Sequence, residues 1–266
     1  MIGWQKPFRG TQLNRAHPLS RNLIGAWVLN ERTGEMIRDS VGGYEGQFVP
    51  SAYLRWEPLG VHFWAAQISL GALDLIGGKS EFTIVSRVIK SSDNSFSRIY
   101  DHASSSQIGI YVTGKNHLGC TMSTNDGSID DYSQESSPIL SIGEIKTIGV
   151  SWSSITGKIQ YWGDGQKQGT ADRSGAYILA SNEIAYIGNR AEGARDFRGD
   201  IEYIYFFDRE LTEAEMQLID REPYCMFTRA LDIGAMLYTA PVVGGSIINQ
   251  FQKANLGADL FNGSLI

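Results

Sequence analysis

The chain has 266 residues, of which 42% are hydrophobic and 20% charged, and its formal net charge at pH 7 is −6. This composition excludes a disordered chain and provides enough apolar material for a sizeable core. The acidic balance argues against nucleic acid as a partner, because binding to phosphates requires clustered Lys and Arg. No apolar run reaches the roughly 18 residues of a membrane span, and no signal-peptide pattern opens the sequence, so we expect no membrane partner and synthesis in the cytoplasm.

Short strand-like segments follow one another along most of the chain. Turn signals rich in Ser, Gly, Asn and Asp separate them, which is typical of an antiparallel sandwich or barrel. Strands and helices do not alternate, so the pattern argues against a parallel sheet. The predicted strands are residues 24–30, 81–89, 97–102, 107–112, 117–123, 145–152, 157–165, 183–188 and 199–207.

The last predicted strand is apolar on most of both faces. Strict alternation places Ile201, Tyr203, Tyr205 and Phe207 on one face. It places Glu202, Ile204, Phe206 and Asp208 on the other face. A strand with this pattern is expected to be central in its sheet, with both faces covered over part of its length.

A short amphipathic helix is predicted directly after that strand. Thr212 is a favourable N-cap, and Glu215 three residues later completes a capping box. Leu211 and Met216 can form the hydrophobic staple that often accompanies such a cap, and Pro223 ends the helix. We expect the helix to lie against the edge of the sandwich as a cap.

Three sequence motifs follow one another along the chain. The first, D-x-S-G-G-x-x-G, is matched with one extra valine by Asp39-Ser40-Val41-Gly42-Gly43-Tyr44-Glu45-Gly46. A looser middle motif is met by Val150, Trp152, Gly157, Lys158, Ile159, Tyr161, Asp164 and Gly165. The last, F-x-G-x-I-x-x-V-x-I-Y-x-R-x-L-S/T-x-x-E, is matched by Phe197, Gly199, Ile201, Ile204, Phe206, Phe207, Arg209, Leu211, Thr212 and Glu215. Together these three motifs resemble domains of the laminin-G type, which are concanavalin A-like sandwiches. The resemblance implies an all-β, antiparallel β-sandwich over residues 20–222.

Two further phrases are NRAHPLSRNLIGAWVLNE at residues 14–31 and REPYCMFTRA at residues 221–230. They carry a narrower resemblance, to laminin-G-like virion proteins of tailed bacteriophages. This resemblance implies a structural protein of a phage particle, decorating the capsid or forming part of a tail or fibre. The chain is then expected in the virion, after synthesis in the host cytoplasm.

We therefore expect the sandwich at residues 20–222 to be flanked by an N-terminal arm at 1–19 and a C-terminal arm at 223–266. The C-terminal arm is too apolar for a solvated tail, yet it shows no sustained strand or helix period. Its large apolar side chains are expected to bind other virion proteins and copies of the chain itself, giving an oligomer; a tail packed on its own sandwich is the alternative. The candidate partner-binding residues are Trp4, Phe8, Leu237, Tyr238, Ile247, Ile248, Phe251, Leu260 and Phe261.

The same fold also occurs in glucanases, so the carboxylates and histidines require separate consideration. The glucanase signature E-x-D-x-x-E is absent. Asp200, Glu202 and Asp208 share one strand face and are expected to be solvated there. The four histidines, His17, His62, His102 and His117, are scattered singly. We predict no catalytic residues and a protein that is not an enzyme, with a glycan hydrolase as the weakest alternative.

A calcium ion is the cofactor that the resemblance would imply. The loop at residues 123–135 offers Asn125, Asp126, Asp130 and Asp131 as oxygen ligands. Its spacing does not fit an EF-hand, and Asn-Asp-Gly is also common turn chemistry. Cys120 and Cys225 lack the spacing of a zinc site or a disulfide framework. We predict no cofactor and no metal ligands.

The second function that we consider is a lectin-like module that binds glycans on the host surface. Sugar binding requires exposed aromatic side chains on a concave face or in loops. Trp56, Trp64 and Trp162 are the candidates, although tryptophan in a β-rich chain more often belongs to the core. The sequence does not decide which way these three rings face.

Overall fold

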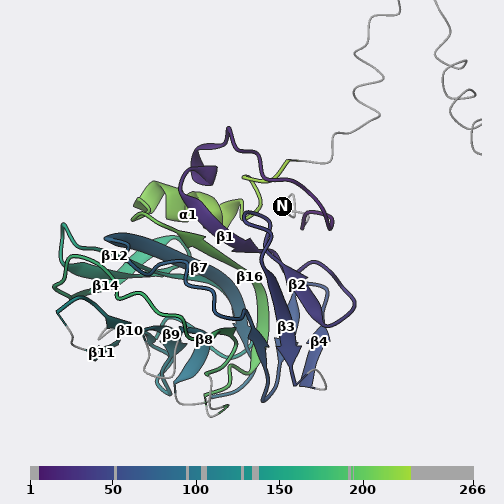
Figure 1. The fold of residues 1–266 in the computed structure, drawn as a ribbon. Coiled ribbons are helices and arrows are strands. Elements are labelled where there is room, and N and C mark those ends of the chain that lie inside the picture. The colour runs from purple at the N-terminus through teal and green to yellow at the C-terminus, as the bar shows by residue number, and fades with distance from the viewer. Residues whose placement is uncertain are drawn as a thin grey trace, which may run out of the picture. The chain divides into compact units, whose positions relative to one another are not determined.

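The structure is a computed structural model, and it describes residues 6–50, 53–93, 96–102, 107–126, 129–133, 138–190, 193 and 195–228. The chain divides into two compact units, Met1–Arg229 and Ala230–Ile266. All described residues belong to the first unit, which Figure 1 shows as a stack of two β-sheets with a helix on one side. None of the helices in these ranges is long and apolar enough to span a membrane.

The first sheet has eight strands. It contains β14 (Gln166–Asp172), β13 (Lys158–Gly163), β12 (Ile145–Ser153), β7 (Glu81–Lys90), β16 (Gly199–Phe207), β5 (Val61–Phe63) and β4 (Leu54–Trp56) in that order, and β1 (Leu23–Trp27) pairs with β16.

The second sheet also has eight strands. Their order is β11 (Ile129–Ser133), β10 (Leu118–Ser123), β9 (Ile108–Val112), β8 (Ser97–His102), β15 (Ala185–Ile187), β6 (Gln67–Ser69), β3 (Glu45–Val49) and β2 (Met36–Arg38). Neighbouring strands in both sheets are antiparallel. The predicted all-β antiparallel sandwich is therefore confirmed.

The core lies between the two sheets and is rich in aromatic rings. Phe206 of β16 packs edge-on against Trp27 of β1, with ring centroids 5.6 Å apart, and against Tyr100 of β8, at 4.9 Å. All three side chains are buried. Because β8 belongs to the second sheet, these contacts join the two sheets through a single ring.

β16 is central in the first sheet, as its pattern predicts, because it pairs with β1, β5 and β7. The predicted faces of this strand need one correction. The register with β7 shifts between Ile201 and Tyr203, so Ile201 packs in the inter-sheet core together with Ile204 and Phe206. Simple alternation had placed Ile201 with Tyr203, and a β-bulge of this kind interrupts alternation by one residue.

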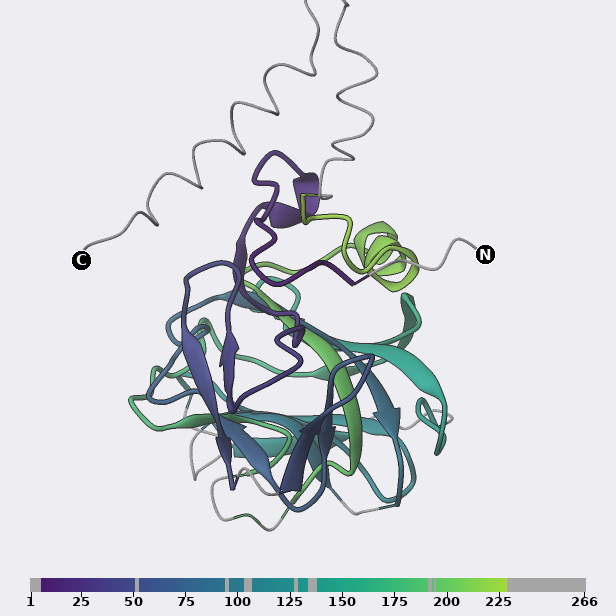
Figure 2. The ribbon, with the colours of Figure 1, turned by 90° about the vertical axis from the view of Figure 1, so that its right-hand side faces the viewer.

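A second apolar cluster covers the outer face of the first sheet. We call it the outer cluster, and it consists of Leu19, Leu23, Ala26, Val28, Val85, Trp162, Tyr203, Tyr205, Phe207, Leu211, Met216, Ile219, Tyr224, Met226 and Phe227. It is covered by the helix α1 (Glu213–Arg221) and by the short 3₁₀ helix η1 (Pro18–Ser20), which lie beside each other in Figure 2. Residues before 20 and after 222 therefore pack on the sandwich in this region.

The predicted capping box of α1 is present. The Thr212 hydroxyl accepts a hydrogen bond from the Glu215 backbone N–H at 3.3 Å, and the Glu215 carboxylate accepts one from the Thr212 backbone N–H at 2.9 Å. Arg209 adds two hydrogen bonds to the same carboxylate, at 2.9 and 2.8 Å. Met216 and Ile219 point into the outer cluster, so the helix lies on the outer face of the sheet close to its edge strand β14.

The capping carboxylate makes helix stability depend on pH. Partial burial alone would raise the pKa of Glu215, but the hydrogen bonds from Arg209 and Thr212 outweigh it and lower the pKa to about 2. A depressed folded-state pKa adds stability above the usual glutamate range, and that stability is lost as the pH falls toward 2. At pH 7 we expect Glu215→Gln to lower the free energy of unfolding by about 1 kcal/mol, and we expect no difference near pH 2.

Urea unfolding at both pH values measures this effect. Glu213→Gln is the control, because Glu213 lies in the same first turn but outside the capping box. An equal loss of stability from Glu215→Gln at pH 7 and pH 2 would contradict the electrostatic origin of the effect.

Candidate functional site

The three tryptophans considered for sugar binding have different environments. Trp162 is 3% exposed and lies in the outer cluster, where its indole Nε1 donates to the Ser151 hydroxyl at 3.0 Å. Trp56 is partly buried against Phe48. Trp64 is 49% exposed. Of the three candidates, Trp64 therefore presents its ring to solvent.

Arg198 holds the exposed ring of Trp64. Its guanidinium lies 4.9 Å from the centre of the Trp64 ring, and its Nε donates to the carboxylate of Asp196 at 2.7 Å. The same carboxylate accepts a hydrogen bond from the Ala65 backbone N–H at 3.3 Å. Trp64 and its neighbour are thus bound through one arginine–carboxylate pair to a segment more than a hundred residues later in the chain.

A second pair of the same kind lies on that segment. The guanidinium of Arg195 lies 4.7 Å from the centre of the Phe96 ring, and Phe96 is 38% exposed. Phe96 in turn packs on Tyr111, with ring centroids 5.5 Å apart. Tyr111 lies across Gly119, where any side chain would overlap its ring. The segment from Arg195 to Arg198 therefore places two arginines over two exposed aromatic rings.

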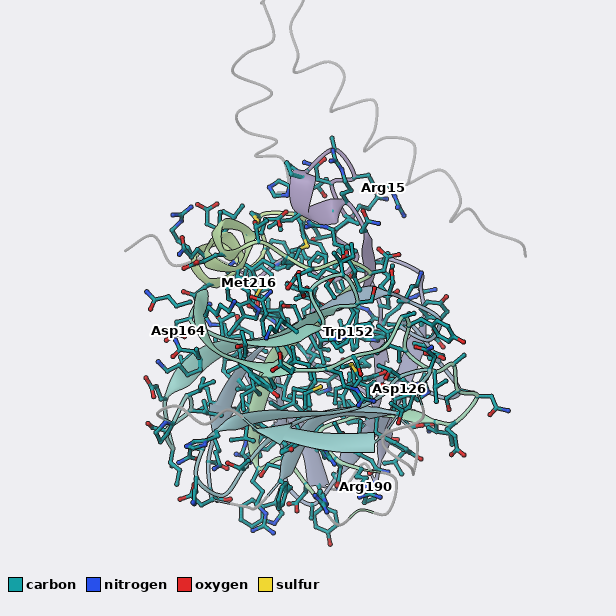
Figure 3. The ribbon with its side chains drawn as sticks, turned by 90° about the vertical axis from the view of Figure 1, so that its left-hand side faces the viewer. Arg15, Asp126, Trp152, Asp164, Arg190 and Met216 are labelled. Carbon is teal, nitrogen blue, oxygen red and sulfur yellow. The ribbon has the colours of Figure 1, made fainter. Side chains whose placement is uncertain are left out.

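Backbone hydrogen bonds fix the position of this segment beside β8 and the residue that follows β7. Arg98 at the start of β8 donates its backbone N–H to the Arg195 carbonyl at 2.9 Å, and Ser91 donates to the Arg198 carbonyl at 2.8 Å. The buried Asn189 side chain accepts backbone hydrogen bonds from Arg190 at 2.8 Å and Arg195 at 3.0 Å. We call the region of Trp64, Phe96, Arg195 and Arg198 the loop end. Arg190 shares the Asn189 side chain with Arg195, and Figure 3 shows Arg190 on the side of the molecule opposite Arg15.

The three carboxylates predicted to share a face of β16 have separate partners. The nearest partner groups are His62 for Asp200 at 2.5 Å, Tyr224 for Glu202 at 2.6 Å and Lys79 for Asp208 at 3.2 Å. Burial holds the pKa of Tyr224 well above its usual value, so its hydroxyl stays protonated and donates to Glu202. Glu202 is 9% exposed, so the expectation of a solvated side chain is wrong for this residue. The physical reason is that β16 is central and Tyr224 covers it.

The loop predicted to offer calcium ligands is held by hydrogen bonds within the protein. Asp126 pairs with Arg173 at 3.2 Å and accepts from the Ser174 hydroxyl at 2.9 Å, while the Asn125 side chain accepts from the Ala176 backbone N–H at 2.7 Å. The side chains of the other two predicted ligands, Asp130 and Asp131, lie outside the described residues. Within the described part of the chain, no group of three His, Cys, Asp or Glu side chains could hold a metal ion.

The N-terminal segment is anchored by a partly buried lysine. Lys6 Nζ donates to the carbonyl oxygens of Leu29, Leu59 and Glu202 at 2.9, 2.6 and 2.7 Å. These three bonds match the three donors of an ammonium group. Burial lowers the pKa of Lys6 to about 7, although the carboxylates of Glu202 and Glu31 counteract it. The segment after Lys6 is therefore attached to the sandwich by its first described side chain.

A cavity of about 380 Å³ lies beside this segment. Its lining includes Phe8, Arg15, Asn30, Arg38 and Phe227. Phe8, predicted to bind a partner, is 61% exposed there. The other predicted partner-binding residues lie outside the described residues, namely Trp4, Leu237, Tyr238, Ile247, Ile248, Phe251, Leu260 and Phe261.

Similarity to solved structures indicates the fold. Trypanosoma rangeli sialidase superposes with a TM-score of 0.56 at 13% identity, covering 82% of this chain and 36% of the sialidase. The same enzyme with 2,3-difluorosialic acid gives 0.54 at 14% identity, covering 79% and 34%. A mutant of HCR D/C VPI 5995 gives 0.58 at 13% identity, covering 76% and 52%. The chain thus spans about a third of the length of the sialidases, and no curated protein sequence matches it.

These neighbours correct one prediction. The sequence analysis predicted that the protein is not an enzyme. That prediction is contradicted, because sialidases, which are glycoside hydrolases, have a similar fold. At 13–14% identity the likeness shows the fold alone and assigns no activity to this chain.

The family comparison agrees with the motifs and with the two-sheet architecture. The model of the concanavalin A-like lectin/glucanases superfamily matches residues 65–217, which is more than half of the chain. The matched range runs from the residue after Trp64 into α1 and so includes Phe96, Arg195 and Arg198. The chain belongs to the concanavalin A-like lectin/glucanases superfamily.

Proposed function

We propose that the sandwich is a carbohydrate-binding module and that it binds sugars at the loop end. The observation that carries this proposal is the half-exposed ring of Trp64, held in place by Arg198. An exposed tryptophan offers a large rigid surface, and its ordering cost is small when a neighbour already fixes the ring. Membership in a superfamily of lectins and glucanases supports a sugar ligand.

A glycan array probed with the intact chain tests this proposal. We expect Trp64→Ala to weaken binding to the glycans found on the array at least about tenfold, because a central aromatic contact contributes about 2 kcal/mol or more. The melting temperature should stay unchanged, since the ring is half exposed.

Tyr177→Ala is the matched control. Tyr177 is similarly exposed, at 45%, but it lies four residues after Arg173, which pairs with Asp126, and does not belong to the loop end. Binding that is equally strong in the Trp64→Ala variant would contradict a site at the loop end. A complete lack of binding to the array would contradict the carbohydrate-binding function.

We further propose that this module belongs to a structural protein of a phage particle, a capsid decoration or a tail or fibre component. The sequence resemblance supports this context, and so does the arrangement of the termini. Leu13 and Phe227 form an antiparallel bridge, and Asn14 donates to the Met226 carbonyl at 2.8 Å. The first and last described segments therefore lie side by side, near Arg15 and away from Arg190 in Figure 3. Attachment at one end would leave the loop end accessible.

Deletion of residues 230–266 tests this attachment. The first compact unit ends at Arg229, so the shortened chain is expected to fold with an unchanged circular dichroism spectrum. We expect it to lose association with phage particles and with other copies of the chain, because the predicted partner-binding residues after 236 are removed. Co-sedimentation with particles measures the first loss and light scattering the second. A shortened chain that co-sediments as well as the full chain would contradict the proposal.

A further inference from the structure

The two arginines at the loop end, Arg195 and Arg198, differ in whether a carboxylate lies next to the guanidinium. Arg198 forms an ion pair with Asp196, so its charge is compensated. Arg195 lies over the ring of Phe96, and within the described residues its guanidinium has no carboxylate in ion-pair distance. One positive charge at the loop end is therefore not neutralised by a neighbouring carboxylate of the described chain, although the protein as a whole carries a net charge of −6.

The backbone of Arg195 is held at both of its polar groups. Its N–H donates to the buried side chain of Asn189 at 3.0 Å, and its carbonyl accepts from the Arg98 N–H at 2.9 Å. The side chain then rests on Phe96, which is supported by Tyr111. A guanidinium that is already positioned loses less conformational freedom when it binds a ligand.

The chemistry of this arginine indicates the charge of the ligand. A guanidinium presents parallel N–H donors that match the two oxygens of a carboxylate or sulfate, and such charge-assisted pairs are stronger than neutral hydrogen bonds. Arg195 and Arg198 are three positions apart in the chain, which corresponds to at most about 10 Å between their Cα atoms. An oligosaccharide that contacts Trp64 can therefore also reach the guanidinium of Arg195.

We propose that the loop end selects anionic glycans, with Arg195 binding the carboxylate or sulfate of an acidic sugar while Trp64 contacts a neighbouring ring. This inference rests on the proposed carbohydrate-binding function and adds the class of ligand to it. Arg195 provides the selectivity for charge, and Trp64 provides contact area that acidic and neutral sugars share.

Matched glycan pairs test the selectivity. The probes are oligogalacturonate against its methyl ester, sialylated against desialylated oligosaccharides, and sulfated against unsulfated ones, each measured with the full-length chain. We expect the charged member of at least one pair to bind about tenfold or more tightly, since hydrogen bonds to charged groups are the stronger class. The pairs separate carboxylate from sulfate. Because the pairing is electrostatic and exposed to solvent, the preference should shrink as salt is added.

Two variants assign the preference to Arg195. Arg195→Gln is expected to remove the difference between charged and neutral partners while keeping the neutral affinity, and Arg195→Lys should restore part of it. Arg15→Gln makes the same change of charge at the opposite end and should leave all affinities unchanged. Unchanged melting temperatures in all three variants establish that the fold is intact.

The outcomes distinguish this inference from the function on which it rests. Equal affinity for charged and neutral members of every pair, or a preference that survives Arg195→Gln, overturns the selectivity but leaves carbohydrate binding in place. A chain that binds no glycan of any kind overturns both. A preference lost in Arg195→Gln and kept in Arg15→Gln supports the inference.

Discussion

Replacement of Gly199 by alanine is expected to lower the free energy of unfolding by about 4 kcal/mol or more. Gly199 begins β16 with φ at +144°, a conformation that residues with a side chain rarely adopt. A Cβ atom built there would overlap the carbonyl oxygen of Ile89 on β7 and lie 3.0 Å from the Cα of Lys90. Because both obstacles are backbone atoms, the two central strands must separate to make room.

Urea unfolding measures the loss, and Gly71→Ala is the control. Gly71 also has a positive φ, +68°, but a Cβ built there meets no atom within 4 Å. Its replacement should therefore cost only the conformational strain, about 1–2 kcal/mol. If the two variants were equally destabilised, the close approach of β16 to β7 would not be the cause. Gly199 directly follows Arg198, so a soluble Gly199→Ala chain is also expected to bind glycans more weakly.

The second large effect is expected for Phe206→Ala, which should lower the free energy of unfolding by about 3–5 kcal/mol. Phe206 is fully buried and contacts Trp27 and Tyr100, so its ring links the first sheet to the second. Its removal loses the transfer free energy of the ring and leaves a cavity that rigid aromatic neighbours cannot fill. Chemical unfolding followed by tryptophan fluorescence reports the change.

Phe8→Ala is the matched control, because it removes the same ring at a position that is 61% exposed. We expect that control to change stability by no more than about 0.5 kcal/mol. Phe206→Leu retains most of the volume and should fall between the two. A loss below that of the control would mean that the aromatic contacts between the sheets do not contribute to stability.

The sequence determined nine of the strands and the helix of this protein, because their signals are local. Each of the nine predicted strand segments coincides with an observed strand, among them β7, β12 and β16, and the capping box of α1 is present. Alternation of apolar residues and a capping motif are readable within about ten residues. The class of fold follows from them, since strands at this spacing without intervening helices form antiparallel sheets.

Local signals did not identify the remaining strands. The strands β2 to β6 and β11 have three to five residues each, and their sequences lack an apolar run that stands out from the surrounding turns. β14 is an edge strand with the polar sequence QKQGTAD, so it buries little and shows no apolar alternation. These segments become strands because neighbouring strands supply hydrogen-bond partners. β14 pairs with the preceding strand β13, whereas β5 pairs with β16, more than a hundred residues later.

In the candidate site, too, the sequence shows the residue types, whereas tertiary packing decides their contacts. Trp64 could be named from the sequence as a candidate for sugar binding, but whether its ring faced the core or the solvent was decided by packing. Its partner Arg198 and the pair of Arg195 with Phe96 were missed, because each contact joins residues about a hundred or more positions apart. Side-chain charge and ring type are properties of the sequence, whereas the neighbours that compensate a charge or cover a ring are set by how the two sheets and their loops pack.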